Sequence, residues 1–183
     1  ITQGALGDCY FLSALSVLGN SRTVELFVCQ EDSDHKNESD PNHWKKTGAF
    51  MLKFSKNGEF EYVIVDDWLP MCNDTPAFTK GGMDGLEIWP AILEKAYAKL
   101  YGSYQAIEAG KVHLALADLV ENGFPEQLAL KTYKNNVKVF AEKMRFLDKV
   151  QALMGAGSPE HEMGDRAINE EGIVQGHAYA ILD

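Results

Sequence analysis

The chain has 183 residues, of which 45% are hydrophobic and 24% are charged, as in an ordinary globular protein with a sizeable core. Asp and Glu number 27 against 17 Lys and Arg, and the net charge of −10 argues against nucleic acid as a partner. The three cysteines are far apart and form no CxxC pair, which fits a reducing, cytoplasmic compartment and predicts neither a disulfide framework nor a zinc knuckle. Since no apolar run approaches the roughly 20 residues that span a bilayer, we expect no transmembrane segment.

Residues 1–18, ITQGALGDCYFLSALSVL, place a cysteine where a glycine-containing turn meets an apolar helical pattern. Asp8 is a good helix N-cap, and the spacing of the apolar residues predicts a helix over Cys9–Leu18. A helix N-terminus favours the thiolate form of Cys9, although a charged Asp8 close by would oppose it. Gln3 supplies an amide that could stabilise an oxyanion beside the sulfur. A buried structural cysteine in a capped amphipathic helix remains the alternative.

The middle of the chain predicts a hairpin followed by a long helix. Gly48–Phe54 and Gly58–Asp66 alternate apolar and polar residues around an Asn-Gly pair, the preferred two-residue hairpin turn. A wide apolar stripe then predicts a helix with Pro90 in its first turn and Gly102 just past its end. Glu87 stands before this helix, where a carboxylate suits the helix dipole.

The second half of the chain predicts a mixture of helices and strands. Three elements are expected first: a helix over Val112–Val120, a strand over Gln127–Thr132 and an amphipathic helix over Val137–Met154. Ile173–Asp183 then forms a strand pattern in which Gly176, just before His177, permits close approach of another backbone. His177 could be the base that a cysteine nucleophile needs, but a histidine on an apolar strand can equally be a structural core residue.

Four stretches together resemble the signature motifs of the calpain family of cysteine proteases, in the family's order. They are QGALGDCYFL at residues 3–12, VDDWLP at 65–70, EIWPAILEKAYAKL with GSY at 87–104, and GHAY at 176–179. The resemblance implies an α+β, papain-like fold. Its helical lobe, residues 1–110, carries the cysteine, and residues 111–183 form the first part of a β-rich lobe that carries the histidine. Protein substrates would bind as extended peptides in the cleft between the lobes.

The resemblance also implies a cysteine endopeptidase. Cys9 would be its nucleophile, His177 its acid–base partner and Gln3 a donor to the oxyanion. One departure is Tyr10, which stands where the family has a tryptophan. The other is that the family's catalytic asparagine, in an Asn-Pro-Trp motif, would follow Asp183, so we expect a fragment that need not be active alone.

Three further residues match functional positions of the family. Gly110 and Gly176 match glycines whose backbone binds the main chain of the substrate. Glu87 matches a ligand of a regulatory calcium ion in the first lobe, so the resemblance implies Ca²⁺ as a cofactor. A helix-start carboxylate without a metal is the alternative for Glu87.

Two other functions remain open. One is a transglutaminase-like acyl transferase, against which the Gln3-to-Cys9 spacing argues. The other is a catalytically inactive calpain-like module that binds peptides, against which the joint presence of Gln3, Cys9 and His177 argues.

Overall fold

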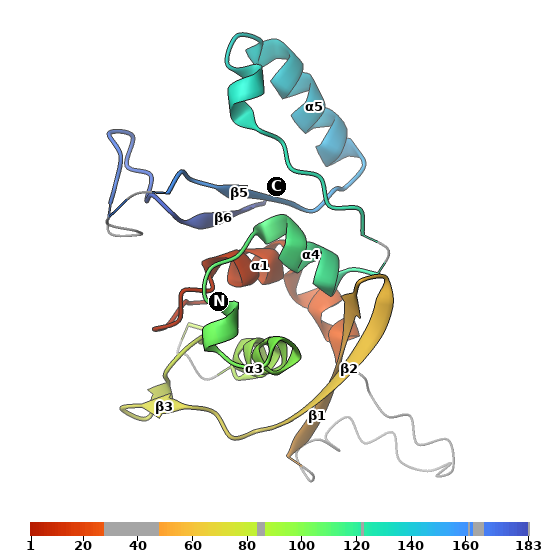
Figure 1. Cartoon of the computed structure of the whole chain (residues 1–183), viewed down its shortest axis with the longest axis vertical. Helices are drawn as coiled ribbons and strands as arrows, with labels where there is room; N and C mark the ends of the chain where they lie inside the picture. Colours follow the sequence, from red (N-terminus) through yellow and green to blue (C-terminus); the bar gives the residue numbers. More distant parts are fainter. Residues whose placement is uncertain (28–47, 84–86, 122, 161, 163–166, 183) are drawn as a thin grey trace.

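The computed structural model describes residues 1–27, 48–83, 87–121, 123–160, 162 and 167–182, and the side chains of 20–24 lie outside this description. Helix α1 (Cys9–Thr23) lies at the centre of the molecule, with α3 (Trp89–Tyr101) on one side and α4 (Val112–Leu119) on the other (Figure 1). Helices and short antiparallel strands alternate along the chain, which confirms the α+β class.

Helix α1 is buried along most of its regular length. Its first turn begins at Asp8, whose backbone carbonyl accepts hydrogen bonds from the N–H groups of Phe11 and Leu12 at 2.8 and 3.2 Å. The regular part ends at Gly19, with φ 71° and ψ 168°, as the sequence predicts. Phe11 stacks on Tyr97 of α3 at 4.1 Å between ring centroids, which joins the two helices. A 3₁₀ turn, η1 (Val24–Leu26), follows.

The predicted hairpin is present as β1 (Ala49–Lys56) and β2 (Glu59–Asp66). Its turn residues Asn57 and Gly58 have φ values of 53° and 83°, the positive pair that a type I′ turn requires. One face of the hairpin is buried in the core, through Leu52, Phe54, Val63 and Val65. A second small hairpin, β3 (Met71–Cys72) with β4 (Thr75–Pro76), lies at the edge of the molecule, and the sequence did not indicate it.

Helix α3 begins and ends as predicted. Pro90 occupies its first turn, and Gly102 closes it in a left-handed conformation with φ 105°. Its lysines anchor it to β2 and the chain that follows. The Lys95 ammonium donates to the Asp66 carboxylate, whose pKa it lowers, and Lys99 donates to the Ile64 carbonyl at 2.8 Å. A 3₁₀ turn, η2 (Gln105–Ile107), leads from α3 towards α4.

The second half of the chain departs from the predictions in two places. The strand expected over Gln127–Thr132 is wrong: this segment pairs with no strand in the described residues, and a 3₁₀ turn, η3 (Leu130–Tyr133), lies there instead. Tyr133, the last residue of this turn, packs its ring against Phe140 of α5, at 5.4 Å between centroids. The helix predicted to reach Met154 ends earlier, since α5 covers Val137–Lys149.

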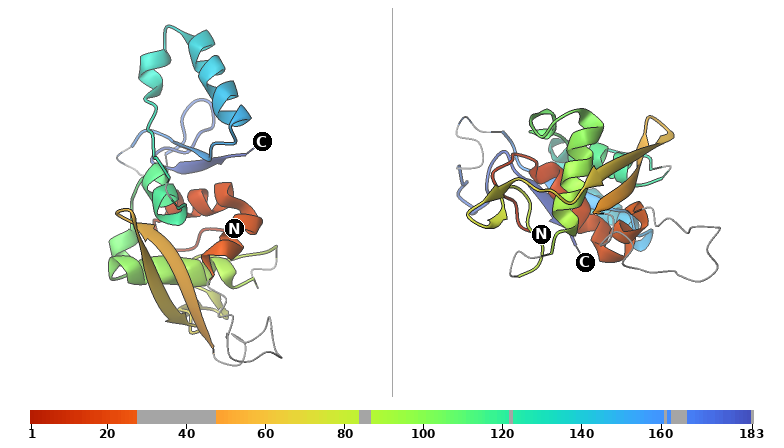
Figure 2. Two further views of the ribbon diagram at one scale, coloured as in Figure 1. Left: turned by 90° about the vertical axis from the view of Figure 1, so that its right-hand side faces the viewer. Right: turned by 90° about the horizontal axis from the view of Figure 1, so that it is seen from below.

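Met154 instead begins a strand. β5 (Met154–Gly157) pairs antiparallel with β6 (Ala178–Ile181), and this two-stranded sheet lies against α1 and α4 (Figures 1 and 2). Helix α5 lies beyond the sheet, on the side away from α1. α4 packs on α1, and its Ala115 and Leu119 belong to the same hydrophobic core. The lobe boundary at residue 110 stays a prediction.

A buried carboxylate ties α4 to its neighbours and gives a test of the core. Asp118 accepts hydrogen bonds from the hydroxyls of Tyr97, at 2.9 Å, and Tyr101, and it pairs with Lys56 at 3.4 Å. Asp118→Ala should lower the free energy of unfolding by about 2–4 kcal/mol, because buried hydroxyls would lose their acceptor. Urea unfolding measures this. Asp148→Ala, on the exposed end of α5, is the control and should cost under about 0.5 kcal/mol; equal losses would contradict the role given to Asp118.

Candidate active site

Backbone hydrogen bonds join the turn that leads into α1, residues 2–8, to the segment 77–80, which we describe as a clasp. Thr2 and Lys80 form an antiparallel bridge with backbone hydrogen bonds of 2.8 and 2.9 Å, and the Ala5 N–H donates to the Ala77 carbonyl at 3.1 Å. Between them, a Cβ on Gly4 would lie 2.0 Å from the Phe78 carbonyl oxygen. Gly4 is therefore required by this close approach of two backbones.

Gln3 lies within this clasped turn and is half-buried. Its Nε2 donates to the Leu6 carbonyl at 2.7 Å, which fixes the side chain over the turn that precedes Cys9. An amide nitrogen carries two hydrogens, so a second donor remains for a ligand. Cys9 itself is the first residue of α1 and is half-buried against the core. The sulfur therefore stands at a helix N-terminus, as the sequence predicts.

Asp8 does not cap α1 with its side chain. Its side chain is fully buried, and neither carboxylate oxygen meets a hydrogen-bond donor among the described residues. Burial, reinforced by the nearby Glu94 carboxylate, raises the pKa of Asp8 to about 8. The expected N-cap is wrong because the carboxyl turns into the core instead of towards the first turn. Since Asp8 is then mostly neutral at pH 7, it does not oppose a thiolate at Cys9.

Gly110 lies directly beside the residue after the candidate nucleophile. A Cβ built on Gly110 would lie 2.4–2.7 Å from atoms of the Tyr10 ring, so no side chain fits there. Ala109 adopts a left-handed conformation, with φ 61°, and donates its N–H to the Gly7 carbonyl at 2.9 Å. These contacts hold the exposed backbone of Gly110 next to the start of α1. Tyr10, in place of tryptophan, supplies the ring on which Gly110 rests.

His177 immediately precedes β6 and is half-buried. Ser158 fixes its backbone: the His177 N–H donates to Ser158 Oγ at 2.9 Å, and the His177 carbonyl accepts from the Ser158 N–H at 2.9 Å. The ring lies edge-on to that of Tyr179, at 5.1 Å between centroids. The next residue, Ala178, is buried in the same core as Tyr10, and β6 contacts α1. The histidine therefore stands at the end of a strand that packs on the helix of Cys9.

Sequence reasoning did not single out Ser158 or Tyr179. The Tyr179 hydroxyl accepts from the Val174 N–H at 3.0 Å and donates to its carbonyl at 3.2 Å, which closes the loop before His177. In the sequence, Tyr179 is marked only as the last residue of the GHAY motif, and no local pattern marks the contact of Ser158 with His177, 19 residues away. Gly176 is exposed with φ 58°, and its N–H donates to the Pro159 carbonyl at 2.7 Å. A substrate main chain would therefore bind Gly176 through its carbonyl group.

Glu87 is exposed just before α3. Its N–H donates to the Gly81 carbonyl at 3.2 Å, and its Oε2 accepts from Trp89 Nε1 at 3.2 Å. Calcium takes carboxylate and backbone carbonyl oxygens, so this corner of the chain suits the chemistry of that ion. Within the described ranges, however, no group of three or more His, Cys, Asp or Glu side chains could hold a metal. Residues 84–86, which join Gly81 to Glu87, lie outside the description.

Comparison with known proteins settles the family. The family model described as calpain family cysteine protease matches residues 1–183. The chain belongs to the calpain family. The calpain-type cysteine protease DEK1 of Zea mays is 39% identical over 190 residues, which cover 100% of this chain and 8% of that protein. The calpain-2 catalytic subunit of Gallus gallus is 33% identical over 181 residues, with 99% of this chain and 24% of the relative covered.

Calpain-B of Drosophila melanogaster is 32% identical over 181 residues, with 99% of this chain and 18% of the relative covered. The chain thus spans at most 24% of the length of these three relatives. The resemblance read from four motifs is confirmed, and with it the protease fold. None of the helices in the described part of the chain is long and apolar enough to cross a membrane. The roles of the individual site residues stay predictions.

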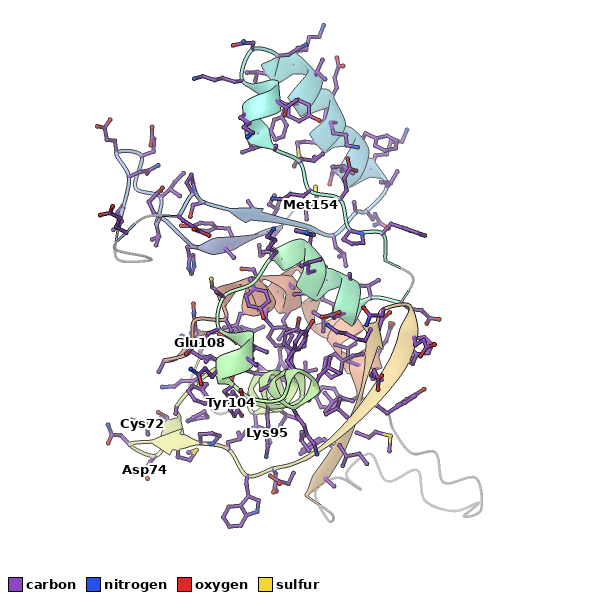
Figure 3. The ribbon with its side chains drawn as sticks, viewed as in Figure 1. Cys72, Asp74, Lys95, Tyr104, Glu108 and Met154 are labelled. Atoms are coloured by element: carbon purple, nitrogen blue, oxygen red, sulfur yellow. The ribbon has the colours of Figure 1, made fainter. Side chains whose placement is uncertain are left out.

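Thiol reactivity tests the position of Cys9. In the full-length protein at neutral pH, iodoacetamide should label Cys9 faster than Cys72, since a helix N-terminus favours the thiolate. Cys72 is exposed at the tip of the β3–β4 hairpin, remote from α1 (Figure 3). Mass spectrometry of tryptic peptides gives both rates, and that of Cys29, which lies outside the described residues. In urea the rates should converge; equal labelling in the folded protein would count against a catalytic Cys9.

Proposed function

We propose that this calpain domain is the catalytic region of an endopeptidase that cleaves proteins bound as extended peptides. The observation that carries the proposal is the meeting of two segments at the start of α1: residues 3–10, which hold Gln3 and Cys9, and residues 109–110. The turn with Gln3, the sulfur-bearing residue Cys9 and the exposed backbone of Gly110 are joined by direct contacts. The strand that follows His177 packs against the same helix.

The chemistry follows from the residue types. The Cys9 thiolate adds to the peptide carbonyl carbon, and the charge moves to the carbonyl oxygen. The Gln3 amide and the Cys9 backbone N–H donate to this oxyanion. His177, as imidazolium, gives its proton to the amine nitrogen as the C–N bond breaks, which leaves a thioester. His177 then takes a proton from water, the hydroxyl adds to the thioester carbon and the C–S bond breaks.

Glycine backbones suit the binding of an extended peptide. Gly110 and Gly176 are both exposed, and neither carries a side chain that would block a second backbone. Main-chain recognition tolerates many side chains, which is the behaviour expected of an endopeptidase that acts on proteins. Gly110→Ala should therefore raise KM and disturb Tyr10, because the added methyl meets the ring.

Substitution of the three catalytic candidates tests the proposal. With unfolded casein as substrate, Cys9→Ser and His177→Ala should each abolish hydrolysis by the full-length protein. Gln3→Ala should lower kcat by about 10²–10³ with little change in KM, since one of two oxyanion donors is lost. Cys72→Ser is the matched control and should leave the rate unchanged. Full activity of the Cys9→Ser variant would refute Cys9 as the nucleophile, whereas a native protein that binds casein without hydrolysing it would favour an inactive peptide-binding module.

We also propose that calcium regulates the enzyme through a site that includes Glu87. The carboxylate of Glu87 and the nearby backbone carbonyls are the oxygen donors that calcium prefers, and bound calcium would fix the chain before α3. Calcium would neutralise charge and order this segment; it takes no part in the bond-breaking steps above.

A calcium titration tests this part of the proposal. Glu87→Ala should weaken calcium binding at least tenfold by isothermal titration calorimetry, because a charged ligand is removed. It should also raise the calcium concentration needed for half-maximal hydrolysis. Glu59→Ala, an exposed carboxylate at the start of β2, is the control. Full activity in a chelator, together with unchanged calcium binding by the Glu87 variant, would leave Glu87 as a helix-start carboxylate.

A further inference from the structure

Two buried carboxyl groups, those of Asp8 and Glu94, interact through their side chains next to the start of α1. Asp8 is 0% exposed and Glu94, from α3, is 1% exposed. Neither forms an ion pair with any residue that the structure describes. The mechanism above uses neither of them, yet Asp8 directly precedes Cys9. A buried carboxylate without a cation is costly, so this pair requires a physical explanation.

The two carboxyls differ in their partners. Both oxygens of Glu94 accept the Thr79 N–H at 3.2 Å, and one of them also accepts the Thr79 hydroxyl. The two oxygens of Asp8 have no donor among the described residues, and a proton held between the carboxyls would supply one. With both groups ionised, two acceptors would face each other in a dry site. With one proton present, one carboxyl donates an O–H to the other and a single charge remains, held by Thr79.

The surroundings favour that proton. The titratable side chains that face the pair are Tyr10, after Cys9 in α1, and Tyr104, at the start of η2. Burial, with the negative charges of Asp8 and Glu94 respectively, raises the pKa of both phenols, so they stay neutral and bring no positive charge. Burial and Glu94 raise the pKa of Asp8 to about 8, and burial raises that of Glu94 against the opposing Thr79 bonds.

Glu94 also links the two chain segments that hold the proposed oxyanion donors, and we call these segments the two arms. One arm runs through Thr79, because the segment 77–80 clasps the turn that holds Gln3. The other runs through Asp8 into the first residue of α1, Cys9. Each arm ends on one of the two donors that the proposed mechanism aims at the oxyanion. The spacing of these donors therefore depends on how Asp8 and Glu94 contact each other.

We propose that Asp8 and Glu94 share one proton, and that they are positioning residues which hold Gln3 and Cys9 at the spacing the oxyanion requires. The catalytic consequence rests on the proposed peptidase function; the shared proton does not. Neither residue touches the substrate. Loss of the proton puts two charges in one site, separates the arms and lowers kcat while KM changes little.

The sign of the effect on stability is fixed by the direction of the shift. Unfolded Asp8 releases its proton near its ordinary pKa of 3.8, whereas the folded protein keeps it up to about pH 8. The stability that the proton contributes is therefore complete below about pH 4 and is lost as the pH rises towards about 8. A variant with an uncharged residue in place of Asp8 does not lose this stability. Its stability relative to that of the native protein should therefore increase over the same pH interval.

Two variants separate a shared proton from simple packing. Asp8→Asn keeps the shape and supplies a permanent N–H donor to Glu94, while Asp8→Leu keeps a similar volume without a donor. In the full-length protein, the melting temperature of Asp8→Asn minus that of the native protein should rise by several degrees between about pH 4 and about pH 8. A difference that stays constant with pH would overturn the shared proton, and would mean that Asp8 is charged and has a fixed donor such as a bound water.

Kinetics test the positioning role. At neutral pH, Asp8→Asn should hydrolyse casein within about threefold of the native kcat, whereas Asp8→Leu should lose about 10–100-fold in kcat at similar KM. The ratio of kcat for Asp8→Asn to native kcat should rise through about pH 8, since other titrating groups act on both proteins alike. Equal rates for the Asn and Leu variants would overturn the positioning role. If Asp8→Leu does not fold, the pH dependence of the ratio of kcat for Asp8→Asn to native kcat tests the positioning role instead. A ratio that does not change with pH would overturn that role.

The two parts of the inference can fail separately. A native protein that hydrolyses nothing would defeat the proposed function, while the melting curves would still decide the shared proton. A native protein that hydrolyses casein, with a pH-independent melting difference, would defeat the shared proton and leave the peptidase assignment standing.

Discussion

Close backbone packing at the start of α1 is the constraint on which the rest of the site depends. Gly4 admits the Phe78 carbonyl where any side chain would collide, and the segment 77–80 can then pair with the turn on both sides of it. The backbone N–H of Thr79, within the segment 77–80, donates to Glu94 of α3. The stack of Phe11 on Tyr97 joins α1 to the same helix. These contacts fix the turn that leads directly into the candidate nucleophile.

The second half of the site is attached by packing of a different kind. β6 lies on α1 through Ala178, and the clasp between Ser158 and the His177 backbone sets where the histidine stands relative to that strand. A short strand pair with mainly half-buried and exposed residues is held less firmly than the core around α1. Such an arrangement would allow the adjustment between lobes that the proposed calcium regulation requires.

Local sequence patterns were sufficient to predict the helices and strands that begin or end at a residue type typical of turns or helix ends. The helix at Cys9 ends at Gly19, the hairpin turns at Asn57-Gly58, and the next helix runs from Pro90 in its first turn to Gly102, all residue types that punctuate a chain locally. The strand over Gln127–Thr132 was wrong because this segment has no pairing partner among the described residues and ends in a 3₁₀ turn, whose last residue, Tyr133, packs on Phe140 of α5. Likewise, Asp8 is a residue type typical of an N-cap, but burial in the core, together with Glu94, 86 residues away in the chain, determines its environment. Gln3, Cys9 and His177 were proposed from their residue types and from the motif resemblance, but their spatial relation is a tertiary property that no local pattern determines.

The most direct measurement is a crystal structure of the full-length protein after reaction with a peptide aldehyde. An aldehyde forms a reversible tetrahedral adduct with a nucleophilic cysteine, and its oxygen marks the place of the oxyanion. The account predicts a bond to Cys9 Sγ, with that oxygen within hydrogen-bond distance of Gln3 Nε2, His177 beside the sulfur and the peptide main chain along Gly110. An adduct on another cysteine, or an adduct whose oxygen points away from Gln3 and whose peptide avoids Gly110, would contradict it.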